Sequence, residues 1–153
     1  MIVELQTKNF SLCVYKLKGN LEEIQSFQKE LILRNPDSFY IFSSEKLISP
    51  RLFKIAFYHA CLRWLSGESI SKKLGIEFFI CLFGETQIKE LLKIFELKPS
   101  KNIYLIAINE HLENLNKYKD NIIFEELNLN DKQELKEDER KIIAEINEKI
   151  LKV

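Results

Sequence analysis

The strongest signals for the fold lie in residues 67–99, which read GESISKKLGIEFFICLFGETQIKELLKIFELKP. The segment begins with a turn that holds two lysines. It continues into an apolar run that predicts a strand over residues 77–83 with both faces covered. An amphipathic helix is predicted over residues 86–95, and Pro99 closes it. No two residues of the segment form a nucleophile and its base, so it indicates a binding protein rather than an enzyme.

On either side of this segment, apolar patterns and turn residues predict alternating strands and helices. Strands are predicted over residues 9–17, 38–42 and 103–108, and residues 122–124 form either an edge strand or an extended connection. Helices are predicted over residues 20–35, 50–65, 110–119 and 130–151, the last of them long. Because helices join the strands, we expect an α/β fold in a single domain over residues 1–153. Its central mixed sheet of about four to five strands is flanked by helices.

The predicted helix over residues 50–65 is apolar around nearly its whole circumference. It begins at Ser49-Pro50, a hydroxyl cap followed by a proline in the first turn. A helix that is apolar all round is buried on more than one side. One face therefore meets the sheet, and the other meets either a second helix or a partner protein. Our candidates for a partner contact are Leu62, Trp64 and Leu65.

The charge distribution excludes bulk binding of polyanions. The chain has 23 basic and 23 acidic residues, but residues 51–101 hold nine Lys or Arg against five Asp or Glu. A nucleic-acid contact would therefore involve this middle part and few phosphates. No apolar run is long enough to span a bilayer, and the first residues do not resemble a signal peptide. We therefore expect a cytoplasmic protein without membrane contact.

The sequence offers little for catalysis, metals or cofactors. Its two histidines lack a nearby cluster of thiols or carboxylates, so no metal site is predicted. Its four glycines form no phosphate-binding loop, so no nucleotide cofactor is predicted. The three cysteines lie in apolar runs without a CxxC motif, which favours reduced and inert thiols. A cysteine–histidine pair formed in space leaves one alternative open, a small cysteine-dependent enzyme.

A site for single-stranded nucleic acid is the remaining candidate, since such sites combine a few cations with stacking surfaces and hydrogen-bonding groups. The side chains that offer cations or base-reading groups are Arg63, Lys72, Lys73, Glu77 and Gln87. Trp64 is a nearby aromatic group. In the alternative interpretation, the two lysines contact only water, Gln87 starts a helix and Trp64 packs in the core.

This segment resembles the small tRNA-binding subunit of the KEOPS complex, the p53-related-kinase-binding protein family. The resemblance rests on Gly67, Ile70, Ser71, Gly75, Glu77, Gly84, Gln87 and Ile88. The motif covers about a quarter of the chain, while the length and the order of elements agree along all of it. Two positions depart from the pattern: Ser69 stands where the family often has asparagine, and Glu96 where it often has glycine.

The resemblance implies a noncatalytic subunit without a cofactor or a small-molecule substrate. Members of the family bind the atypical kinase subunit of the complex, and archaeal members also hold tRNA through its single-stranded CCA end. That binding helps the transferase subunit to place threonylcarbamoyl on the adenosine beside the anticodon. The five cationic or base-reading side chains are accordingly expected to bind tRNA. The alternative is a protein–protein adaptor that regulates a kinase without RNA contact.

Overall fold

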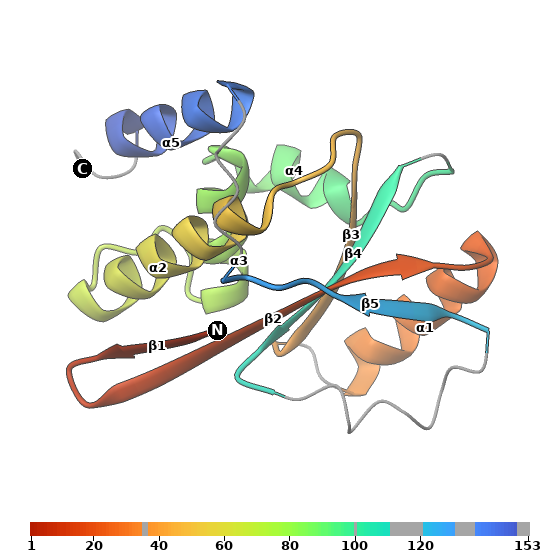
Figure 1. Ribbon diagram of the computed structural model, residues 1–153. Helices are drawn as coiled ribbons and strands as arrows, with labels where there is room; N and C mark the ends of the chain where they lie inside the picture. Colours follow the sequence, from red (N-terminus) through yellow and green to blue (C-terminus); the bar gives the residue numbers. More distant parts are fainter. Residues whose placement is uncertain (35–36, 100, 111–120, 131–136, 150–153) are drawn as a thin grey trace.

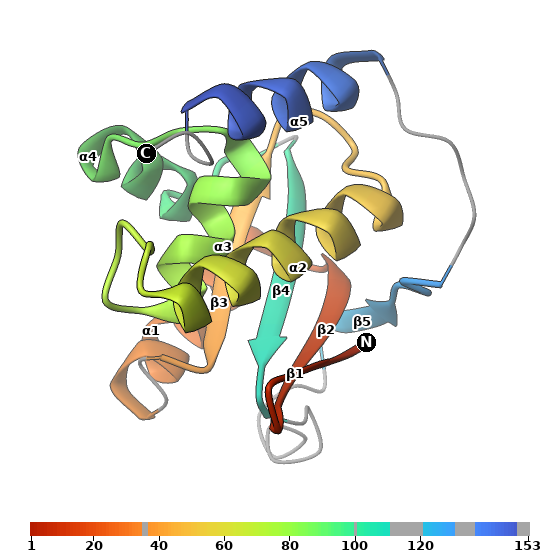
Figure 2. The same cartoon turned by 90° about the vertical axis from the view of Figure 1, so that its left-hand side faces the viewer.

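The computed structural model describes residues 1–34, 37–99, 101–110, 121–130 and 137–149, in which helices cover both faces of a five-stranded sheet (Figures 1 and 2). The strands are β1 (Ile2–Leu5), β2 (Lys8–Lys18), β3 (Phe39–Ser44), β4 (Asn102–Ile108) and β5 (Ile123–Glu126). The helices are α1 (Leu21–Arg34), α2 (Pro50–Ser66), α3 (Leu74–Phe83), α4 (Ile88–Leu91) and α5 (Glu137–Lys149), with a 3-10 turn η1 (Leu92–Phe95). The α/β class and the helix-flanked sheet are confirmed.

No helix in the described ranges has the length and apolar character that crossing a bilayer requires.

The sheet is antiparallel throughout, with the strand order β1-β2-β4-β3 and with β5 paired to β2. β2 and β3 both run antiparallel to β4, so they are parallel to each other with β4 between them. α1 joins β2 to β3, which makes this part of the fold a split βαβ unit. The expected mixed pairing is therefore wrong, because the two parallel strands are not neighbours.

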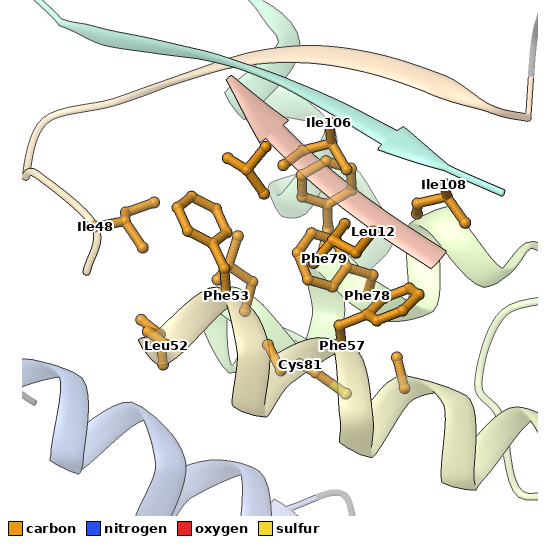
Figure 3. Packing of buried hydrophobic residues seen from close by; sticks show 14 of the residues in the cluster. Leu12, Ile48, Leu52, Phe53, Phe57, Phe78, Phe79, Cys81, Ile106 and Ile108 are labelled. Carbon is orange, nitrogen blue, oxygen red and sulfur yellow. The ribbon is translucent and has the colours of Figure 1, made fainter. Parts of the chain in front are cut away.

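Alternate residues of the central strands point to opposite faces of the sheet and fill two apolar cores. In β4, the residues that face α2 and α3 are Tyr104, Ile106 and Ile108, and those that face α1 are Ile103, Leu105 and Ala107. Figure 3 shows the core on the α2 and α3 side, where phenylalanines of both helices lie beneath the strands. The Phe78 ring of α3 lies 5.9 Å from the Phe57 ring of α2, measured between centroids.

The apolar run after the two lysines forms helix α3, so the predicted strand over residues 77–83 is wrong. Lys73 is the N-cap of this helix, and Gly84 ends it in the left-handed conformation with φ 65°. α3 packs against both α2 and the sheet, and six consecutive residues from Glu77 to Leu82 are buried. A short helix that is buried on all sides has no polar face, so its apolar run looks like that of a central strand.

Of the other predicted helices and strands, most are confirmed and some differ from the structure. The helices at α1 and α2 and the strands at β2, β3 and β4 are confirmed, as is the edge strand at β5. The predicted helix over residues 86–95 is divided into α4 and η1. A C-terminal helix over the full range 130–151 is not shown, since α5 spans 13 residues. The predicted helix over residues 110–119 lies almost wholly outside the described residues.

β1 was not predicted, because its four residues precede a turn without the usual glycine. Gln6 and Thr7 both have positive φ, 48° and 69°, in the tight turn that leads into β2. Such turns are usually recognised by Asn-Gly or Asp-Gly pairs, which are absent here.

Candidate binding site

The candidate site is the 67–73 turn, the seven residues that connect α2 to α3. Gly67 ends α2 in the left-handed conformation with φ 75°, and its N–H donates to the carbonyl of Arg63. The N–H of Glu68 donates to the same carbonyl over 3.1 Å. At the other end, the N–H of Lys73 donates to the hydroxyl of Ser71 over 3.1 Å. The turn is thus held by hydrogen bonds at both of its ends.

A buried ion pair lies beneath this turn. The Arg63 Nε of α2 donates to the Glu77 Oε1 of α3 over 2.9 Å, and the two side chains are 2% and 0% exposed. The second carboxylate oxygen, Oε2, accepts the N–H groups of Ile70 and Ser71, each over 3.0 Å. Arg63 Nη2 also donates to the carbonyl of Glu68. One carboxylate therefore joins α2, the turn and α3.

Two of the predicted RNA-binding residues, Arg63 and Glu77, are the members of this pair. Their charged groups point into the protein and are occupied by each other and by the backbone of the turn. A direct contact between either side chain and RNA stays a prediction. In the present conformation, both support the turn from within.

The two predicted lysines lie on the surface of the turn. Lys72 is exposed, and Lys73 Nζ lies 3.4 Å from Asp37 Oδ1 in a pair whose side chains are 57% and 64% exposed. An exposed pair of this kind is weak, so Lys73 is free to exchange Asp37 for another anion. Both ammonium groups are therefore available to a ligand.

Gln87 is not brought next to the lysines. It is the exposed N-cap of α4, and its N–H donates to Glu85 Oε1 over 2.8 Å. The whole length of α3 separates it from Lys73, which is about 15 Å for a helix of ten residues. The structure therefore groups four of the five predicted residues around the turn and places the fifth at the far end of α3.

Two features beside the turn were not predicted from the sequence. Ile70 is 44% exposed although its N–H is held by Glu77, so an apolar side chain stands on the surface of the turn. A cavity of about 210 Å³ lies between α1, β3 and η1, with Tyr40 and Ile76 in its lining. Burial, together with the charge of Asp37, raises the pKa of Tyr40 to about 12. No sequence motif marks this cavity, because its lining comes from four separate elements, α1, β3, α3 and η1.

The predicted partner-binding residues occupy the end of α2. Leu62 is 38% exposed, while Trp64 and Leu65 are half-buried and pack against the core. Tyr58, one turn before Leu62 on the same helix, is 44% exposed. An open cavity of about 670 Å³ adjoins this face of α2, and its lining includes Arg51 and Tyr58. The second face of α2 is thus partly covered by α3 and partly open.

The cysteines of α2 and α3 are poor nucleophiles. Cys61 and Cys81 are fully buried, and burial raises the pKa of both thiols to about 12. The thiolate is the reactive form of cysteine, and a thiol with such a pKa stays protonated at neutral pH. Burial also lowers the pKa of His59, the histidine nearest to Cys61 in the sequence. In the part of the chain that the structure describes, no three His, Cys, Asp or Glu residues gather as metal ligands.

The sequence matches the family model described as kinase binding protein CGI-121 over residues 19–147. The matched range contains the 67–73 turn, the ion pair beneath it and all of α1 to α4. It agrees with the resemblance to the p53-related-kinase-binding protein family. No curated protein matches the sequence. With most of its length covered by that model, the chain belongs to the kinase binding protein CGI-121 family.

Proposed function

We propose that this protein is a noncatalytic accessory subunit that binds an atypical protein kinase and the single-stranded CCA end of tRNA. In this role it supports threonylcarbamoyl-adenosine modification of tRNA as a cytoplasmic member of the KEOPS complex. The observation that carries the proposal is the family match over residues 19–147, which includes both candidate surfaces. The buried, protonated thiols of Cys61 and Cys81 favour a binding role over the cysteine-dependent enzyme.

The tRNA contact is assigned to the 67–73 turn. Lys72 and Lys73 supply two exposed cations, which suits a ligand that offers few phosphates. Gly75, two residues after Lys73, packs against the Tyr40 ring, from which a Cβ added at this glycine would lie 2.3 Å. The cavity lined by Tyr40 therefore lies near the lysines and offers an apolar surface on which a base can stack.

Reversing the charges of Lys72 and Lys73 tests whether the turn binds tRNA. Lys72→Glu/Lys73→Glu is expected to weaken tRNA binding by about tenfold or more in a fluorescence titration, because two cations become anions. Lys18→Glu/Lys141→Glu is the matched control, since it makes the same change in net charge at two other exposed lysines. Equal affinities for the wild type and the Lys72/Lys73 variant would remove the lysines from the site.

A second titration tests recognition of the CCA end. A tRNA without its terminal CCA is expected to lose most of its affinity, and a short CCA-ending single strand is expected to compete with intact tRNA. Normal binding of the truncated tRNA would exclude end recognition. A protein that binds the kinase but no tRNA at all would instead be the adaptor without RNA contact.

The kinase contact is assigned to the C-terminal part of α2, with the exposed Leu62 as its main residue and the half-buried Trp64 and Leu65 as further candidates. A helix with exposed apolar side chains can lay them into a hydrophobic groove of a partner protein. Leu62→Glu is expected to abolish co-purification with the kinase while the protein stays folded. Leu33→Glu is the control, because Leu33 is 84% exposed on α1, at the opposite face of the sheet. Retention of the kinase by the Leu62 variant would make α2 an internal packing helix only.

A further inference from the structure

We infer that Arg63 and Glu77 are positioning residues, which hold the 67–73 turn in one conformation and thereby place Lys72 and Lys73 for their ligand. The first part concerns the turn alone. The second part rests on the proposed function, because it assumes that the lysines bind tRNA.

The geometry assigns this role because the pair is bonded to the turn as well as to itself. Glu77 Oε1 accepts from Arg63, while Oε2 accepts from the backbone N–H groups of Ile70 and Ser71. Arg63 donates to the carbonyl of Glu68 in addition. Three of the seven backbone units in the turn are therefore tied to two side chains that belong to the flanking helices.

A carboxylate is required for this arrangement, whereas packing alone is not enough. Glu77 is 0% exposed, and both of its oxygens receive hydrogen bonds from charged or backbone donors. Apolar side chains of similar volume can replace a buried ion pair without loss of fold. They would leave the N–H groups of Ile70 and Ser71 without an acceptor, and these would turn toward water. Fold stability and turn conformation can thus be separated by substitution.

The lysines follow the anchored backbone directly. Lys72 is the next residue after Ser71, and Lys73 begins α3 as its N-cap. Their backbone is fixed on both sides while their side chains remain exposed. A ligand that binds to a fixed turn does not have to order it, which improves affinity.

The test compares wild type with Arg63→Met/Glu77→Leu, which removes both charges and keeps apolar volume. We expect an unchanged urea midpoint, hydrogen exchange at the Ile70 and Ser71 amides at least about tenfold faster, and tRNA affinity about tenfold weaker. Lys93→Met/Glu90→Leu is the matched control, since it removes an exposed ion pair of α4 and η1 whose atoms lie 2.8 Å apart. The control should leave all three measurements unchanged.

Each other outcome decides one part of the inference. Unchanged exchange at Ile70 and Ser71 would overturn the role of the pair in holding the turn. Faster exchange with unchanged tRNA affinity would overturn the placement of the lysines. If the wild type binds no tRNA, the proposed function fails, and the exchange rates still decide whether the pair holds the turn.

Two single substitutions cover the case in which the double variant does not fold. Arg63→Lys keeps a cation beside Glu77 and leaves both hydrogen bonds of Oε2 intact, so slow exchange at Ile70 and Ser71 should be retained. Glu77→Gln places an amide donor against either the arginine or the two backbone donors, so exchange there should accelerate. Equal exchange rates in these two variants would overturn the inference.

Discussion

A buried carboxylate from another helix binds at each end of helix α2, and we call these two contacts the N-terminal and C-terminal closures. At the C-terminal end, Glu77 of α3 pairs with Arg63. At the N-terminal end, Glu139 of α5 accepts the N–H of Ser49 over 2.8 Å. Ser49, Arg63, Glu77 and Glu139 are the four buried polar or charged residues in the part of the chain that the structure describes. Each end of the helix is thus tied by a buried carboxylate.

The difference between the ends lies in their distance along the chain. Arg63 and Glu77 are 14 residues apart, so the C-terminal end is closed within one continuous segment. Ser49 and Glu139 are 90 residues apart, so the N-terminal end is closed only when α5 docks. The first closure shapes a surface turn, whereas the second attaches the last described helix to the rest of the protein. The comparison teaches that similar chemistry serves a local role at one end and a global role at the other.

The largest expected effect comes from breaking the C-terminal closure. Arg63→Met leaves the Glu77 carboxylate buried without its cation, which should lower the free energy of unfolding by about 3–5 kcal/mol. Urea denaturation followed by circular dichroism measures the loss. Arg51→Met, an exposed arginine on the same helix, should change it by less than about 0.5 kcal/mol. Similar values for the two variants would show that the buried Glu77 carboxylate does not need its cation.

The N-terminal closure should contribute less to the free energy of unfolding. Glu139→Ala leaves the buried N–H of Ser49 without its charged acceptor, at an expected cost of about 1.5–3 kcal/mol. Because only α5 is released, limited proteolysis should cut that helix before the rest of the protein. Glu137→Ala, an exposed residue of the same helix, is the control. Proteolysis that is no faster than in the control would mean that the Glu139 contact does not hold α5.

A third substitution tests the packing beside the turn. A Cβ added at Gly75 would lie 2.3 Å from the Tyr40 ring, which touches Phe79 with a centroid distance of 5.4 Å. Gly75→Ala must therefore displace Tyr40, and overpacking of this kind costs about 1–3 kcal/mol. The double variant Gly75→Ala/Tyr40→Leu should recover most of the loss in a thermal melt. An unaffected melting temperature in the single variant would mean that Tyr40 moves aside freely.

Between its two ends, the face of α2 that packs in the core is apolar, and the smallest effect at neutral pH is expected there. Burial raises the pKa of Cys61 from 9.0 to about 12, so the folded protein keeps a proton that the unfolded chain loses above pH 9. Stability from this group is complete below pH 9 and is lost as the pH rises toward 12. As the pH rises from 9 toward 12, the urea midpoint of Cys61→Ala should therefore fall less than that of the wild type. Identical pH profiles would indicate a thiol that is hydrated in the folded state.

The sequence predicted the helices α1 and α2, whose first residues form recognisable caps. α1 has Asn20 as a cap, whose Oδ1 accepts the N–H of Glu22 over 2.8 Å, and the cap at Ser49 was equally clear. α3 was misread because burial on every side removes the periodicity that separates a helix from a strand.

The sequence predicted that four of the five candidate residues lie together, but neither their burial nor the separate position of Gln87. Arg63, Lys72, Lys73 and Glu77 do meet at one turn, as their closeness in the sequence suggested. The sequence analysis places Glu77 at the start of a predicted strand, whereas on α3 its side chain turns back beneath the turn to Arg63. Which charged residues of a segment are buried depends on the helix packing, and no local pattern in the sequence reports it.

The position of β4 between β2 and β3 sets the order in which the protein can be completed during synthesis. Leu12 of β2 pairs with Ile108 of β4, so the two strands that flank the centre are made long before the strand that joins them. In a nascent chain that ends before Asn102, the edges of β2 and β3 that pair with β4 are open, and the β4 residues of both cores are missing. Such edges attract other chains until they are paired. The ribosome-bound protein is therefore most vulnerable to aggregation just before β4 emerges from the exit tunnel.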